Sequence, residues 1–320
     1  MCKIGVTDMI FFIDFLKALA ACLITNAHYT GIYPTDLIAN GGLIGDILFF
    51  AVSGYCLYEV RGTFLKWYSK RIYRCYVSVI LMTMLYLFLG FYTLQEHNLF
   101  WWLVYPTTYH FVASIVVLYI PYYFVMKSSW LRRRIPMLMC AIFTAAFIYY
   151  LFGYDKSYYH IDNVREPMIR VLFFESMLLG AWFRSNDSHM QEGRWWHIPA
   201  TAVTFLGYFA SKLLFSRFPM LSDFQVLNQV LIFALLYFLF KTVSSARMVL
   251  ECLPEQVKRC IRTISRITLE IYVVQYVLID LIRPVGMFPL NWILLTGSIL
   301  LSALLLNRVV VCLNPKRNVG

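Results

Sequence analysis

About ten stretches of this chain are apolar over roughly the length that crosses a bilayer, which takes about 20 residues as a helix. Of all residues, 60% are hydrophobic and 14% are charged, whereas soluble domains average about 45–50% apolar and about 25% charged. We therefore predict one all-α membrane domain over residues 1–320, a polytopic membrane helical bundle of about ten transmembrane helices. The predicted spans are 9–28, 41–58, 74–94, 101–126, 135–152, 168–184, 198–215, 225–242, 264–283 and 290–312.

The basic residues gather mostly in every second gap between these stretches. Lys and Arg concentrate in cytoplasmic loops of membrane proteins, so this alternation predicts that both termini lie in the cytoplasm. A multi-pass protein of the cell membrane is expected. The segments predicted inside hold Arg61, Lys66, Lys70, Arg71, Arg74, Lys127, Arg132, Arg133, Arg134, Lys241, Arg247, Lys258, Arg259, Arg262, Arg266, Lys316 and Arg317. The segments predicted outside hold Lys156, Arg165, Arg170, Lys212, Arg217 and Arg283.

The net charge of +11 does not by itself indicate nucleic acid, because the same excess arises from cytoplasmic anchoring of the spans. We expect membrane lipids around the protein and no nucleic-acid partner. The eight cysteines form no C-x-x-C pair, so neither a disulfide framework nor a metal site is predicted.

The first span carries the residues that are most costly in a bilayer. Asp14 and Lys17 are three apart and can pair on a helix. His28 follows Lys17 by eleven positions, about three turns, which places both on one face about 16 Å apart along the axis. With Asn26, they form a polar strip that suggests a function. The alternative is that Lys17 reaches to the cytoplasmic edge and His28 sits in the outer headgroup layer.

The second span begins with glycines and continues into small residues. Gly45, Ser53 and Gly54 allow close helix packing, and this explanation suffices for the glycines. It does not explain Asp46, unless that carboxylate lies at the outer interface.

Arg71 and Arg74 follow the second span and are three apart, so they face the same way at the start of a helix. Two guanidinium groups on one face at the cytoplasmic surface make a suitable phosphate clamp. An ordinary cytoplasmic anchor is the alternative.

Taken together, these segments resemble the acyltransferase-3 family of integral membrane acyltransferases, whose members mostly acylate bacterial surface polysaccharides. The likeness rests first on a basic residue followed after ten positions by histidine, here Lys17 and His28. The second element is Phe-Phe-x-x-Ser-Gly-Tyr, here Phe49–Tyr55, and the third is Arg-x-x-Arg, here Arg71 and Arg74. The family's ten-helix core also fits the predicted span count.

A looser likeness lies at Thr268–Tyr272, which is similar to a late family segment and has Gln275 nearby. Two positions depart from the family pattern. The family more often has arginine where Lys17 stands, and its acidic residue in the second span usually lies one position nearer the phenylalanine pair than Asp46 does.

The resemblance implies transfer of an acyl group, with acetyl expected, from acyl-CoA to a hydroxyl of a glycan. Such a transfer needs a base, and histidine suits this task because its usual pKa is near 6.5. We assign His28 this role, with an acyl-histidine relay as a variant. Lys17 is expected to line the route of the donor, with Asp14 holding it.

The same resemblance implies a cytoplasmic site for CoA, the only cofactor expected. Arg71 and Arg74 are predicted to hold its phosphates, with Ser53 and Tyr55 beside them. Two other functions remain open. A polysaccharide or lipid-linked sugar transporter would also have a polar strip in a helical bundle, but it would not need CoA. A non-catalytic scaffold of a glycan assembly complex would tolerate the loss of His28.

Overall fold

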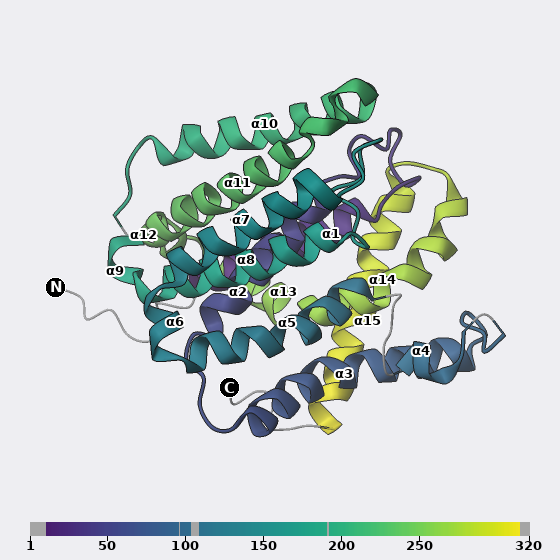
Figure 1. Ribbon diagram of the computed structural model, residues 1–320. Helices are drawn as coiled ribbons and strands as arrows, with labels where there is room; N and C mark the ends of the chain where they lie inside the picture. The colour runs from purple at the N-terminus through teal and green to yellow at the C-terminus, as the bar shows by residue number, and fades with distance from the viewer. Residues whose placement is uncertain (1–10, 96, 104–108, 191, 314–320) are drawn as a thin grey trace. The chain divides into compact units, whose positions relative to one another are not determined.

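The structure is a computed structural model that describes residues 11–95, 97–103, 109–190 and 192–313. Within these ranges every regular element is a helix (Figure 1). The ten long helices are α1 Phe11–Ala27, α2 Gly42–Cys56, α3 Phe64–Phe88, α5 His110–Lys127, α7 Ile135–Gly153, α8 Pro167–Ser185, α10 His197–Arg217, α11 Val226–Ser245, α14 Thr268–Ile282 and α15 Leu290–Leu313. Shorter elements connect them: α4 Leu99–Leu103, α6 Ser129–Arg133, α9 Asp187–Met190, η1 Pro219–Phe224, α12 Arg247–Glu251, α13 Glu255–Arg266 and η2 Arg283–Val285.

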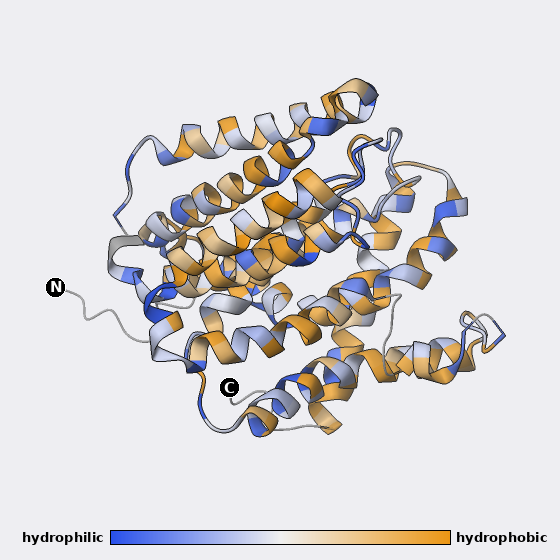
Figure 2. Cartoon of the chain, viewed as in Figure 1, coloured by the Kyte–Doolittle hydropathy of each residue, from blue (hydrophilic) through white to orange (hydrophobic). Residues whose placement is uncertain are grey.

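The helical bundle predicted from the apolar stretches is confirmed, and each predicted span overlaps one long helix. Apolar residues colour most of these helices orange in Figure 2. Six of the described helices are long and apolar enough to cross a membrane: α3, α5, α7, α10, α11 and α15. The helices α1, α2 and α14 have 17, 15 and 15 residues, and α8 carries Arg170, Glu175 and Arg184. The count of ten spans therefore stays a prediction, as does the location of both termini.

Three predicted spans differ from the observed helices. The helix α3 begins at Phe64, ten residues before the start of the span predicted as 74–94. The basic segment that precedes this span is itself helical and continues into it without a break. The stretch predicted as 101–126 overlaps α4 and α5, and its residues 104–108 lie outside the described residues. The stretch predicted as 264–283 is interrupted at Ile267 between α13 and α14. Lys316 and Arg317, assigned to the cytoplasmic side, lie outside the described residues.

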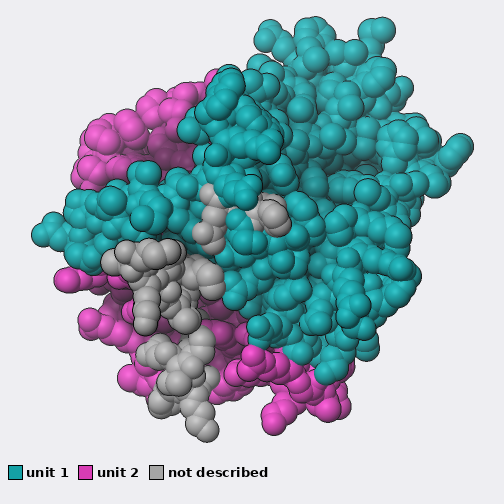
Figure 3. Space-filling model, turned by 90° about the vertical axis from the view of Figure 1, so that its left-hand side faces the viewer, with its two compact units in different colours: residues 1–16, 46–60, 120–258 teal, residues 17–45, 61–119, 259–320 magenta. Residues whose placement is uncertain are grey.

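The chain divides into two compact units (Figure 3). Unit 1 comprises residues 1–16, 46–60 and 120–258, and unit 2 comprises residues 17–45, 61–119 and 259–320. In unit 1, α10 packs on α11, α7 on α8, and α8 on α11. In unit 2, α14 packs on α15 and α3, and α4 packs on α3. The prediction of one membrane domain over the whole chain stays a prediction.

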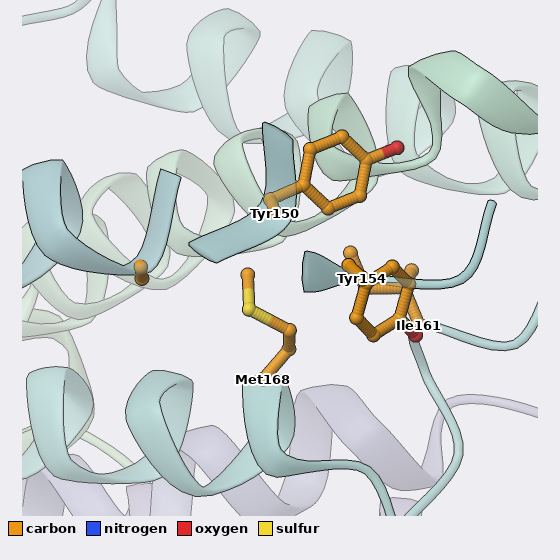
Figure 4. Close-up of a cluster of buried hydrophobic side chains, with 5 residues drawn as sticks. Tyr150, Tyr154, Ile161 and Met168 are labelled. Carbon is orange, nitrogen blue, oxygen red and sulfur yellow. The ribbon is translucent and has the colours of Figure 1, made fainter. Parts of the chain in front are cut away.

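A cluster of buried side chains in unit 1 joins the end of α7 to the following loop and the start of α8 (Figure 4). The rings of Tyr150 and Tyr154 stack at 5.4 Å between centroids. Tyr150 also donates a hydrogen bond of 2.7 Å to the carbonyl oxygen of Asp223, so its polar end is satisfied while its ring is buried. The cluster comprises Ala146, Tyr150, Tyr154, Ile161 and Met168.

Two glycines hold α2 and α8 together within unit 1. A Cβ atom on Gly54 would lie 1.9 Å from the carbonyl oxygen of Met177, and one on Gly180 would lie 1.8 Å from that of Ala51. Each glycine therefore lets the backbone of the other helix approach directly. The close packing predicted for Gly54 is confirmed.

Candidate active site

His28 lies in unit 2, one residue beyond the end of α1, and its side chain is half-buried. Its ring meets the edge of the Tyr276 ring on α14 at 5.1 Å between centroids. Tyr276 in turn contacts the rings of Tyr109 and Tyr272, at 5.6 Å each. Aromatic contacts of this kind restrict the orientation of a ring. The imidazole of His28 thus contacts one tyrosine, Tyr276, which is itself packed against Tyr109 and Tyr272.

The loop that follows His28 is held by Asn26. The amide of Asn26 donates to the carbonyl oxygens of Ile38 at 2.8 Å and of Asn40 at 3.0 Å. Its side-chain oxygen accepts a hydrogen bond of 2.6 Å from the Tyr33 hydroxyl. Asn26, expected as part of a polar strip, therefore closes the loop between α1 and α2.

The same loop is attached to α15. The hydroxyls of Tyr29 and Thr296 lie 3.0 Å apart, and the Asn291 amide donates to the carbonyl oxygen of Ile32 at 2.9 Å. Tyr29 and Asn291 are both buried. These bonds fix the backbone on the C-terminal side of His28.

The glycines at the start of α2 pack against the last turns of α1. A Cβ atom on Gly42 would lie 2.8 Å from that of Ala27, and one on Gly45 would lie 2.7 Å from Cγ1 of Ile24. The glycine-rich start of the second span thus has a packing function directly beside His28. This confirms the close packing predicted for Gly45.

The polar residues earlier in α1 lie at the predicted helical spacing. Lys17 is half-buried in unit 2, and its eleven-residue separation from His28 corresponds to about 16 Å along a helix. Asp14 lies in the first turn of α1 and belongs to unit 1.

Arg71 and Arg74 lie within α3, in unit 2, where the sequence predicted the start of a helix. Arg71 is half-buried, and its guanidinium carbon lies 5.7 Å from the centre of the buried Trp67 ring. Arg74 is exposed. Because both residues are on a regular helix, they share one face, as predicted.

Tyr55 is buried and belongs to a polar cluster in unit 1 whose other members are half-buried. Its hydroxyl donates to Oδ1 of Asp187 at 2.8 Å and accepts from Nη1 of Arg184 at 3.2 Å. Arg247 donates to both carboxylate oxygens of Asp187, at 2.6 and 3.2 Å, and lies over the Phe12 ring at 3.9 Å. We call Tyr55, Arg184, Asp187 and Arg247 the Tyr55 cluster. Ser53, also in unit 1, is half-buried on α2.

Sequence reasoning missed several residues on α14. Tyr276 lies four positions after Tyr272, a spacing that places both on one helix face, but nothing in the sequence indicated contact with His28. Glu270, without a predicted role, is buried and accepts a hydrogen bond of 2.8 Å from Ser78. Gln275 is buried, and its amide nitrogen and oxygen have no hydrogen-bond partner among the described residues.

The family model for acyltransferase-3, described as an acyltransferase domain, matches residues 10–309. The chain belongs to the acyltransferase-3 family. It is therefore a multi-pass membrane acyltransferase, and the match extends through both compact units. Searches of the curated proteins and of the solved structures return no significant match.

Proposed function

We propose that this acyltransferase-3 protein moves an acyl group, with acetyl expected, from cytoplasmic acyl-CoA to a hydroxyl of a cell-surface glycan or of its lipid-linked precursor. The observation that carries the proposal is His28, a half-buried histidine just beyond the end of α1 whose ring contacts Tyr276, in a chain of this family. A histidine so placed is suited to general base catalysis.

The reaction assigns a task to each group. His28 takes the proton from the acceptor hydroxyl as the oxygen attacks the thioester carbonyl. The carbon–sulfur bond then breaks, and the CoA thiolate leaves and takes up the proton that His28 accepted. The products are an O-acyl ester and free CoA. In the variant, His28 carries the acyl group between donor and acceptor.

The donor is proposed to bind from the cytoplasmic side. Arg71 and Arg74, which share one face of α3, would hold the phosphates of CoA. Lys17 would line the route to His28, with Asp14 near the start of the same helix. Ser53 and Tyr55, also predicted for the donor, belong to unit 1, where Arg184 and Asp187 orient the Tyr55 hydroxyl, and their part in donor binding stays a prediction.

A liposome assay with acyl-CoA on one side tests the proposal. Purified protein is reconstituted in a known orientation, labelled acetyl-CoA is supplied inside or outside, and CoA release is followed with a glycan extract of the host as acceptor. Wild type is expected to consume acetyl-CoA supplied on the side bearing Arg71 and Arg74, and His28→Ala is expected to be inactive. The matched control is His160→Ala, because His160 is a half-buried histidine of unit 1 that stacks on Tyr154 and Tyr158.

Two results would overturn the proposal. If His28→Ala, shown to fold like wild type, releases CoA at the wild-type rate, then His28 is not the base. If glycan crosses the membrane while no CoA is released, the protein acts as a transporter of the glycan.

A further inference from the structure

A hollow in unit 2 lies beside the end of α3, and nothing in the proposed reaction uses it. Its volume is about 680 Å³, within the range of about 300–1,000 Å³ that is usual for ligand sites. The next helix after α3 is α4, which packs on α3 (Figure 1). We therefore call this pocket the α3–α4 hollow. Its lining comprises Met84, Leu87, Tyr92, Thr93, Leu94, Gln95 and Leu99.

The wall of this hollow changes character along its length. Met84 and Leu87 belong to α3, a helix long and apolar enough to span a membrane, and lie in its last two turns. Tyr92, Thr93 and Gln95 come after the helix has ended at Phe88 and bear hydroxyl and amide groups. One part of the hollow therefore lies where hydrocarbon is expected and the other part where water and headgroups are expected. A ligand that matches both parts is an amphiphile with a hydrocarbon chain and a polar head.

Tyr92 is held firmly as part of the polar wall. Its ring stacks on the buried Trp102 ring at 4.2 Å and 14°, and meets the edge of Tyr86 at 5.3 Å. Its hydroxyl lies 3.2 Å from that of Tyr109. The indole nitrogen of Trp102 donates to the carbonyl oxygen of Thr93 at 3.2 Å, which ties the neighbouring backbone to the same support. Rigid aromatic walls with a few adjacent polar groups are typical of small-molecule sites and suit the C–H faces of a sugar ring.

Contacts between side chains connect this wall with the candidate base. Tyr92 touches Tyr109 through the hydroxyls, Tyr109 packs against Tyr276, and Tyr276 packs against His28. All four residues belong to unit 2. The basic residues at the start of α3 are expected on the cytoplasmic side, so the hollow at its other end is expected on the outer side, where an acceptor would arrive.

An aromatic belt at the membrane surface is the simpler explanation for tryptophan and phenylalanine in this region. It accounts for Phe100, whose side chain is 64% exposed on α4. A belt requires neither a hollow nor a series of contacts that leads from Tyr92 to His28. These two features favour a ligand.

We propose that the α3–α4 hollow binds a lipid-linked saccharide, the acceptor of the acyl group. The lipid chain lies against Met84 and Leu87, and the sugar lies beside Tyr92, Thr93 and Gln95. This inference rests on the proposed function and deepens it, because it makes the acceptor the lipid-linked precursor and not the finished polymer.

Photolabelling tests binding without relying on activity. The probe is a prenyl-diphosphate-linked N-acetylglucosamine with a diazirine on its prenyl chain, added to the protein in nanodiscs, and the labelled peptides are mapped by mass spectrometry. We expect labelling to concentrate on residues 84–99 of wild type. Tyr92→Ala is expected to reduce it about three- to tenfold, the loss of one aromatic contact. Gln95→Ala, at an exposed position that is tolerant of change, is expected to reduce it in the same direction.

The control is Phe100→Ala, an exposed aromatic residue on α4 that does not line the hollow, and it should label like wild type. The proposal is overturned if the label spreads over the lipid-facing helices, or if Phe100→Ala loses as much label as Tyr92→Ala and Gln95→Ala do.

A kinetic comparison separates this site from the proposed function. With the same probe lacking the diazirine as acceptor, Gln95→Ala should raise the KM for acceptor and leave the KM for acetyl-CoA unchanged. If acetyl-CoA is consumed but the variants keep the wild-type KM for acceptor, the hollow is not the acceptor site and the proposed function stands. If the hollow is labelled but no acceptor leads to CoA release, the binding site stands and the proposed function fails.

Discussion

The ring of Tyr276 meets the ring of His28 edge-on, with the ring planes at 64° and the centroids 5.1 Å apart. The two residues come from α14 and from the end of α1, which are far apart in the sequence. Such a contact is worth about 0.5–1.5 kcal/mol beyond the burial of the rings. In the proposed reaction a general base must be held within reach of its proton, so we expect Tyr276 to act as a positioning residue for His28.

Replacement of Tyr276 by alanine is expected to lower kcat for CoA release about tenfold, since about 1.4 kcal/mol of positioning corresponds to that factor. The KM for acetyl-CoA should not change. Tyr276→Phe keeps the ring and is expected to retain most of the activity. Steady-state kinetics in proteoliposomes measure both constants. If Tyr276→Phe is as impaired as Tyr276→Ala, the hydroxyl and not the ring is the important group.

The arginines of α3 give a prediction for the donor. Arg71→Ala and Arg74→Ala are each expected to raise the KM for acetyl-CoA about ten- to hundredfold, because a charge-assisted hydrogen bond contributes about 1.5–3 kcal/mol. The KM of Arg71→Lys for acetyl-CoA should lie between those of the alanine variants and that of wild type, because lysine keeps the charge but cannot form the bidentate contact. Lys70→Ala, an exposed neighbour on the same helix, is the control and should keep the wild-type KM. A KM that is unchanged in both arginine variants would leave these residues as membrane anchors.

The glycines between α2 and α8 give a prediction for stability. Gly54→Ala and Gly180→Ala place a methyl group under 2 Å from a carbonyl oxygen, so the helices must move apart. Each variant is expected to lose about 1–3 kcal/mol of stability, the usual cost of overpacking. Thermal unfolding in detergent micelles would show this as a lower Tm.

Gly297→Ala on α15 is the control for both, because a Cβ atom there meets nothing within 4 Å. It should be neutral or should stabilise the helix by about 0.5–1 kcal/mol. An equal loss in all three variants would show that the close approach of α2 and α8 does not determine the effect.

The sequence was sufficient for features that repeat along the chain. Long apolar stretches predicted the helices, because few other structures satisfy the backbone in a bilayer. Small residues in the second span predicted close packing, and Gly54 and Gly45 confirm it. Arg71 and Arg74 share a helix face as their spacing predicted.

Features that depend on distant pairs could not be predicted in this way. Asn26 closes a loop through carbonyl groups of residues more than ten positions away, and its side chain alone gives no sign of these partners. Likewise, periodicity places Tyr276 on a helix face but does not name the helix that faces it. The break at Ile267 was missed because α13 and α14 follow each other directly in the chain.

The Tyr55 cluster provides the last prediction. Asp187 and Arg247 are paired at 2.6 Å, and their side chains are only 17% and 13% exposed. Asp187→Ala should destabilise the protein by about 1–3 kcal/mol, because it leaves the half-buried Arg247 guanidinium without its carboxylate. The double variant Asp187→Leu with Arg247→Met should recover most of this loss, since it removes both charges.

The exposed pair Asp280 and Arg283, at 3.3 Å, is the control for this pair. Its side chains are 73% and 48% exposed, so Asp280→Ala should cost no more than about 1 kcal/mol. Denaturant titration of the four proteins in the same detergent compares them directly. If Asp187→Ala costs no more than Asp280→Ala, water replaces the lost carboxylate at Arg247 and the pair contributes little to stability. A larger loss with recovery in the double variant would establish that Asp187 and Arg247 stabilise the fold as a pair.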